Sequence, residues 1–128
     1  MKPLELYLHI PFCISKCKYC DFLSAPSEFQ ERQDYVESLC RDIRSYRNLA
    51  EAYVVVSIFI GGGTPSILTP SQIKDIFKSI KETFKLSDGA EITIEMNPGT
   101  VDKEKLRTYR EVGINRLSIG FSRRWMKN

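Results

Sequence analysis

Hydrophobic and polar residues alternate along three short stretches of the chain, at residues 4–10, 91–97 and 115–119. In the first stretch the aliphatic residues from Leu4 to Ile10 alternate with polar ones that include Tyr7 and His9. Such alternation places the two sets on opposite faces of a β-strand. Residues 53–60 are instead almost continuously apolar, as expected of a strand covered on both faces in a parallel sheet. The pattern therefore predicts four strands, three of which have a polar face.

Between these strands, apolar residues recur at helical spacing. Thr69 and Gln72 form the pattern of a capping box, with a proline at the first helical position, and mark a helix start. Gly113 suits the left-handed position that often follows a helix end. Strands and helices alternate, which predicts a parallel sheet with right-handed crossovers. Three helices are expected, over residues 31–47, 69–84 and 102–112.

The polar rows on three strands distinguish between the possible α/β folds. A flat doubly wound sheet buries both faces of its strands, whereas polar rows that converge on one side suit the interior of a full or partial barrel. For any single strand, the polar row could instead mean an edge strand with one solvent-exposed face. We therefore predict an α/β partial barrel whose chemistry lies at the carboxyl ends of its strands. These ends carry three motifs, at residues 13–20, 61–65 and 95–99.

Composition indicates one domain of ordinary globular type, with 128 residues, 42% of them hydrophobic and 27% charged. The net charge is +3 and the basic residues are spread along the chain, so nucleic-acid binding is not indicated. The longest apolar stretch, residues 54–60, is far shorter than the roughly 20 residues that span a bilayer. The first residues lack a signal-peptide pattern, so we expect a cytoplasmic protein.

Three of the four cysteines, Cys13, Cys17 and Cys20, follow the first strand within eight residues. In a reducing compartment such clusters more often bind metal than form disulfides, and thiolates suit iron–sulfur clusters and zinc. Three ligands leave one iron of a cubane cluster open for a substrate. A structural zinc site would require a fourth ligand, for which His9 is the candidate. The spacing favours the cluster, because a strand residue such as His9 has little freedom to reach a metal held by the next loop.

The remaining candidates have simpler alternatives. The Gly-Gly-Gly-Thr-Pro sequence after the second strand allows backbone groups to approach a ligand closely, but an ordinary tight turn also fits. A phosphate-binding loop is disfavoured, since the P-loop lysine is missing. Cys40 lies on the apolar stripe of the first helix and is interpreted as core packing, with a fourth cluster ligand as the alternative. His9 is interpreted as a hydrogen-bonded residue of the barrel interior.

Several motifs carry a resemblance to a known family. The Cys13-x3-Cys17-x2-Cys20 spacing resembles the signature of radical S-adenosylmethionine (SAM) enzymes. The stretches LYLHIPFC, FIGGGTPS, EITIEMNPGT and GINRLSIG resemble the oxygen-independent coproporphyrinogen III oxidase family, up to Gly120. Oxidases of that family have another cysteine where this chain has Phe22, and this departure resembles the heme-chaperone branch. The resemblance implies the N-terminal part of a partial (β/α)6 radical SAM barrel at residues 1–120.

The resemblance also implies cofactors. The three cysteines would hold a 4Fe-4S cluster whose open iron binds the methionine part of SAM, and reduction would release a 5′-deoxyadenosyl radical. Glu95 would anchor the cationic SAM molecule, as a carboxylate favours a nearby sulfonium. Heme, a heme-receiving protein and an electron donor such as flavodoxin or ferredoxin are the implied partners of the full-length form. The other implied SAM contacts are Tyr7, Tyr19, Gly62, Gly63 and Thr64.

The resemblance ends after Gly120, where the family continues with Val-Gln-Ser and this chain reads Phe-Ser-Arg. Loss of one nucleotide from Gly-Val-Gln-Ser codons accounts for this change, so residues 121–128 are interpreted as an aberrant tail. Resequencing the locus tests this hypothesis. We expect the 128-residue chain alone to be poorly soluble or partly molten, with little turnover. A non-functional frameshifted fragment that folds poorly is therefore an alternative interpretation.

Overall fold

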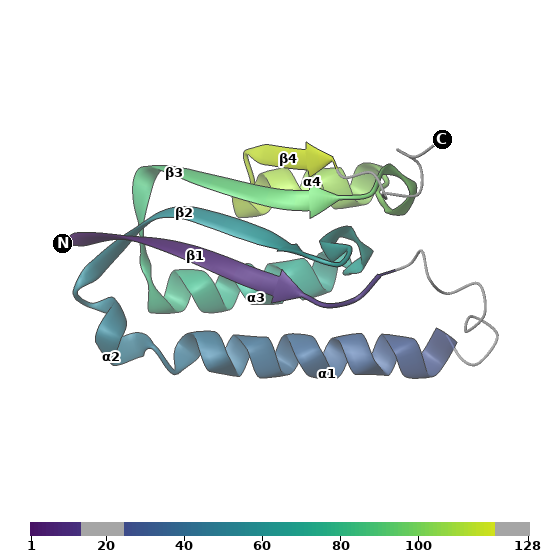
Figure 1. Ribbon diagram of the computed structural model, residues 1–128, viewed down its shortest axis with the longest axis horizontal. Coiled ribbons are helices and arrows are strands. Elements are labelled where there is room, and N and C mark those ends of the chain that lie inside the picture. The colour runs from purple at the N-terminus through teal and green to yellow at the C-terminus, as the bar shows by residue number, and fades with distance from the viewer. Residues whose placement is uncertain (14–24, 120–128) are drawn as a thin grey trace.

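The computed structural model describes residues 1–13 and 25–119, which form a parallel sheet with helices on one face (Figure 1). The strand order is β1-β2-β3-β4, and every neighbouring pair is parallel. All four strands therefore end at the same edge of the sheet, as the sequence predicts. The strands are β1 (Lys2–Ile10), β2 (Tyr53–Gly62), β3 (Lys85–Met96) and β4 (Arg116–Ile119).

Three long helices pack against one face of the sheet, and short helical turns follow β2 and β3 (Figure 1). The predicted capping box is confirmed: the Gln72 amide donates to Thr69 Oγ1 at 3.1 Å, and the Thr69 amide donates to Gln72 Oε1 at 2.9 Å. Gly113 has a φ of 106° after the last helix, also as predicted. The helical elements are α1 (Ala25–Arg44), α2 (Arg47–Ala50), η2 (Pro65–Ile67), α3 (Pro70–Thr83), η3 (Pro98–Thr100) and α4 (Lys103–Val112).

The first two predicted helices have different bounds from those observed. The structure begins α1 at Ala25, before the apolar stripe that the prediction relied on, and ends it at Arg44, so the prediction of a helix to residue 47 is wrong. The short helix α2 follows separately and buries Ala50. Phe84 lies beyond α3 in an extended conformation, although its ring is buried and its amide still bonds the Ile80 carbonyl at 2.8 Å.

A bulge in β2 overturns the prediction that this strand is covered on both faces. The pairing with β1 runs from Leu4–Val55 to Glu5–Ser57, which leaves Val56 without a partner in the register. The extra residue reverses the alternation, so Ile58 lies on the helix side and Phe59 lies on the open side. Phe59 is 37% exposed there, opposite Tyr7 in the register.

The core lies between the sheet and the helices, while the opposite face of the sheet carries the polar rows. Tyr7, Phe59, Thr93 and Arg116 occupy one register row on that open face. The predicted convergence of polar rows on one side of the sheet is thus confirmed. Among the described helices, none has the length and apolar character needed to cross a membrane. The fully buried side chains include Ile10, Val55, Ile58, Ile60, Ile73, Ile76, Phe77, Ile80 and Ile94.

Candidate functional site

The pairing of β1 and β2 continues beyond both strands and brings two of the predicted motifs together. The Gly63 amide donates to the Ile10 carbonyl at 2.7 Å, and the Thr64 amide donates to the Phe12 carbonyl. These bonds hold the backbone just before Cys13 against residues 61–67, which we call the glycine loop. Cys13 itself is an exposed residue at this edge of the sheet.

The close approach explains why glycine occupies two positions of the loop. Gly62 has a φ of 115°, and a Cβ there would lie 2.6 Å from the Ile10 carbonyl oxygen. A Cβ on Gly63 would lie 2.8 Å from Cys13 Sγ and closer still to the Phe12 carbonyl. Real side chains essentially never make such contacts, so only glycine fits. The loop backbone therefore lies directly beside the first cysteine.

Glu95 reaches the same loop from the neighbouring strand β3. Its Oε1 accepts a hydrogen bond from the Gly62 amide at 3.0 Å, and the side chain is only partly buried. A Cβ on Gly61 would lie 2.9 Å from the same oxygen. The carboxylate is thus held against the glycine loop, and its second oxygen has no hydrogen bond to any described residue. The structure brings together Cys13, the glycine loop and Glu95, which the sequence places far apart.

Tyr7 lies on the open face of the sheet, next to this edge. Its hydroxyl is 3.1 Å from His9 Nδ1, and its ring stacks on that of Phe59 with centroids 6.1 Å apart. His9 also approaches the loop, because a Cβ on Gly62 would lie 2.9 Å from its ring. His9 is therefore a hydrogen-bonded residue of the open face, as predicted. Phe59 was missed by sequence reasoning, since only the bulge at Val56 turns it towards Tyr7.

Tyr35 of α1 is a second residue that sequence reasoning missed. Its hydroxyl donates to the His9 carbonyl, and its ring meets Phe12 edge to face with centroids 5.5 Å apart. Burial, together with the nearby Asp42 carboxylate, raises the pKa of Tyr35 above its ordinary value. Tyr35 thereby ties the helix that follows the cysteine segment to the end of β1. A tyrosine at this helical position gives no sequence signal for that contact.

The structure tests only part of the cysteine motif. Cys17, Cys20 and Tyr19 lie outside the described residues, as does Phe22. Within residues 1–13 and 25–119, no three His, Cys, Asp or Glu side chains gather as a metal site would need. Metal ligation by the three cysteines, whether to iron or zinc, therefore stays a prediction.

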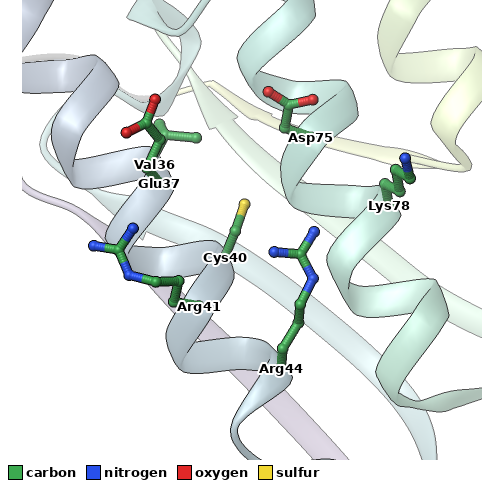
Figure 2. A pocket seen from close by; sticks show the side chains of 7 residues that line it. All are labelled: Val36, Glu37, Cys40, Arg41, Arg44, Asp75 and Lys78. Atoms are coloured by element: carbon green, nitrogen blue, oxygen red, sulfur yellow. The ribbon is translucent and has the colours of Figure 1, made fainter.

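Cys40 belongs to the core, as the sequence predicts. It is 5% exposed and faces α3 from α1, in a groove lined by Arg44 and Asp75 (Figure 2). Burial raises the pKa of its thiol, and a hydrogen bond with Ser79 opposes that shift. At about 1.5 Å per residue, Cys40 lies roughly 22 Å along α1 from its first residue. This position in the core, far along the helix, does not suit a fourth ligand in the cysteine segment.

The fold and the residues at this edge of the sheet are those of a known class of protein. The profile of the radical SAM superfamily matches residues 7–122, and the chain belongs to that superfamily. The solved structure of coproporphyrinogen III oxidase (HemN) from Escherichia coli, a radical SAM enzyme, resembles this chain with a TM-score of 0.80 and 34% sequence identity. The match covers 94% of this chain and 28% of that one. The predicted fold class, the first strands of a radical SAM barrel, is thereby confirmed.

Curated relatives narrow the resemblance within the superfamily. The chain is 45% identical to the heme chaperone HemW of Buchnera aphidicola subsp. Schizaphis graminum and 41% identical to that of Escherichia coli, each over 94% of this chain. It is also 37% identical to an oxygen-independent coproporphyrinogen III oxidase of Synechocystis, over 92% of this chain. These matches agree with the predicted resemblance to the oxygen-independent coproporphyrinogen III oxidase family and to its heme-chaperone branch. The chain spans about a third of the length of these heme chaperones, 32% in both cases.

Proposed function

We propose that this chain is the N-terminal part of the cofactor-binding core of a radical SAM protein. Cys13, Cys17 and Cys20 would hold a 4Fe-4S cluster. The observation that carries the proposal is the junction of Cys13, the glycine loop and Glu95 at one edge of the sheet. A thiol beside a glycine backbone, with a carboxylate from β3 hydrogen-bonded to the same loop, fits a cluster and a cationic ligand side by side.

The residues at this junction have distinct roles in binding SAM. Without side chains at Gly62 and Gly63, the loop backbone and Thr64 can contact the methionine end of the molecule. Glu95 keeps one oxygen on the Gly62 amide and directs its negative charge towards the ligand. Tyr7, supported by its stack on Phe59, would contact the cofactor from the open face. The family resemblance also assigns Tyr19 a contact with the cofactor. A reduced cluster held by the three cysteines would supply the electron for the reductive cleavage of SAM.

The activity of the full-length protein follows the heme-chaperone relatives in this proposal. Heme, a heme-receiving protein and a cytoplasmic electron donor such as flavodoxin or ferredoxin are its partners in porphyrin metabolism. The chain spans about a third of the length of the heme-chaperone relatives, so in a protein of their length further contacts would complete the SAM site. We expect the 128-residue chain to bind cluster and SAM but to turn over little.

Anaerobic reconstitution with iron and sulfide tests the proposal. We expect a brown protein with about four irons per chain, whose low-temperature electron paramagnetic resonance spectrum changes when SAM is added. Cys13→Ala should lose the iron, because it removes one of three ligands. Cys40→Ala is the matched control and should keep the iron, since that thiol lies in the core.

One result would overturn the cluster in favour of zinc. A colourless protein with one zinc per chain, lost in His9→Ala, would show that His9 and the three cysteines form a structural site. Thermal unfolding is measured on the same samples. Absence of any cooperative transition would support the remaining alternative, a poorly folded fragment.

A further inference from the structure

Two loops carry the two halves of the candidate SAM site. The glycine loop supplies Gly62, Gly63 and Thr64, and Glu95 stands just before residues 96–100, which we call the asparagine loop. At the site itself, the Gly62 amide donates to Glu95 Oε1 and so connects the glycine loop to the residue before the asparagine loop. The position of the carboxylate relative to the glycine backbone therefore depends on what holds the loops together behind the site.

Ser66 makes the first of these connections. It is fully buried at the end of the glycine loop, and its Oγ accepts a hydrogen bond from the Asn97 amide at 3.0 Å. Thr100 Oγ1 donates to the Asn97 carbonyl at 2.8 Å, which uses its single proton. The close contact between the two hydroxyls is therefore donated by Ser66 to Thr100. One serine thus bonds the asparagine loop twice.

Lys105 makes the second connection. Its Nζ donates to the Ser66 carbonyl at 2.8 Å and to the Thr100 carbonyl at 2.7 Å, one acceptor in each loop. Its own amide is fixed by Asp102 Oδ1 at 2.9 Å, in the first turn of α4. Hydrogen bonds from an ammonium group are stronger than neutral ones and pull both carbonyls towards one point.

Placing the Lys105 ammonium group between the two loops costs desolvation free energy. Burial lowers the pKa of Lys105, the neighbouring Arg32 lowers it further, and Asp102 opposes both. An apolar side chain would fill the same space without desolvating a charge. What lysine offers here over an apolar side chain is therefore its two hydrogen bonds to the loop carbonyls.

We propose that Lys105 is a positioning residue that sets the separation of the glycine and asparagine loops and thereby orients Glu95 towards the cationic end of SAM. The inference rests on the proposed function for the identity of the ligand. The bridge itself is a property of the protein without cofactor, so the two can be tested separately.

The test compares three variants of the 128-residue chain. Lys105→Met has a similar length and no donor, Lys105→Arg retains donors for both carbonyls, and Lys103→Met removes an exposed lysine from the same helical turn. Hydrogen exchange of the Gly62 and Asn97 amides is measured without cofactor. SAM affinity is measured by equilibrium dialysis on anaerobically reconstituted protein, with iron content as a check on the cluster.

We expect Lys105→Met to speed exchange of both amides and to weaken SAM binding by about tenfold, the loss typical of one strong hydrogen bond. Iron content should not change, because the Lys105 ammonium group bonds the Ser66 and Thr100 carbonyls and is not one of the proposed iron ligands. Lys105→Arg should retain most of the affinity, and Lys103→Met should match the original chain. Exchange at amides between β1 and β2 should be the same in all variants.

The outcomes separate the two proposals. Unchanged exchange at Gly62 and Asn97 in Lys105→Met would overturn the bridge. SAM binding that is equal in Lys105→Met and the original chain, or lost equally in both Lys105 variants, would overturn its role in orienting Glu95. Loss of the cooperative unfolding transition in Lys105→Met would also overturn it, because a bridge between two loops leaves the sheet core intact. Failure of the original chain to bind SAM, with faster exchange in Lys105→Met, would instead overturn the proposed function alone.

Discussion

Gly63 makes the tightest backbone approach at the candidate site. Its amide bonds the Ile10 carbonyl, and the space where its Cβ would stand is taken by the Phe12 carbonyl and Cys13 Sγ. The glycine is therefore a condition for bringing the first cysteine against the loop. Glycine is required at this position because two chain segments pack closely there, and not because the turn itself needs a glycine.

Gly63→Ala should therefore displace Cys13. A Cβ that lies 2.8 Å from Cys13 Sγ, and even closer to a backbone oxygen, forces one of the segments to move. We expect a loss of about 1–3 kcal/mol in the free energy of unfolding and a clear fall in iron content after reconstitution. Urea unfolding and iron analysis measure the two effects.

Gly89→Ala is the matched control for this substitution. A Cβ on Gly89 would meet nothing within 4 Å, so its stability should change by no more than about 0.5 kcal/mol and its iron content should be unchanged. Equal iron content in the two alanine variants would contradict the close approach at Gly63.

Some site residues could be predicted from the sequence, because the residue type alone indicates what the side chain or backbone can contact. Glycines, a carboxylate at a strand end and clustered thiols each indicate a kind of contact. Phe59 and Tyr35 could not be predicted, because their roles depend on the bulge at Val56 and on where α1 packs. Lys105 was missed for the same reason: its partners are backbone carbonyls, which have no sequence signature.

At the scale of elements, periodicity and caps predicted a parallel sheet, the start of α3 and the end of α4. The errors in the strands occur where the register shifts. Val56 is unpaired in β2, and residues 87–90 of β3 lie between the pairs Val55–Leu86 and Ser57–Glu91. An insertion of this kind breaks the two-residue period, so the pattern alone begins β3 at residue 91 and not at Lys85.

The packing of α4 makes the stability of the chain depend on pH in the alkaline range. Tyr109 is buried on this helix, and no described residue bonds its hydroxyl. Burial, with a further contribution from the Asp102 charge, raises the pKa of Tyr109 to about 12 from 10.0. Since the folded state holds the phenol proton more tightly, this contribution is fully present below pH 10 and is lost as the pH rises towards 12.

We therefore expect the free energy of unfolding to fall by about 2–3 kcal/mol more in the original chain than in Tyr109→Phe as the pH rises through this range. Urea unfolding at closely spaced pH values measures the difference. Tyr109→Phe should be at least as stable as the original chain near neutral pH, because it removes a buried hydroxyl without a described partner. Identical pH profiles for the two proteins would contradict the burial of the phenol.

At the scale of the whole molecule, the burial of four residues paired side by side across the sheet shows how far the core extends. Leu8, Ile60, Ile94 and Leu117 are partners along this row on the helix side. The first three are buried, but Leu117 on β4 is 46% exposed and its neighbour Ile119 is 54% exposed. Leu106 on α4 is also exposed. An exposed apolar face on β4, the last strand of the described sheet, favours association between chains, in line with the low solubility expected from the sequence.

Leu117→Lys tests whether this face limits solubility. A charge on the exposed side of β4 should raise the concentration at which light scattering begins, by about twofold or more, because charged edges resist strand pairing. The free energy of unfolding should change by less than about 0.5 kcal/mol, since the side chain is already exposed. Leu8→Lys, in the same row but buried, is the control and should lose cooperative unfolding. Scattering that begins at the same concentration in Leu117→Lys and the original chain would show that association uses another surface.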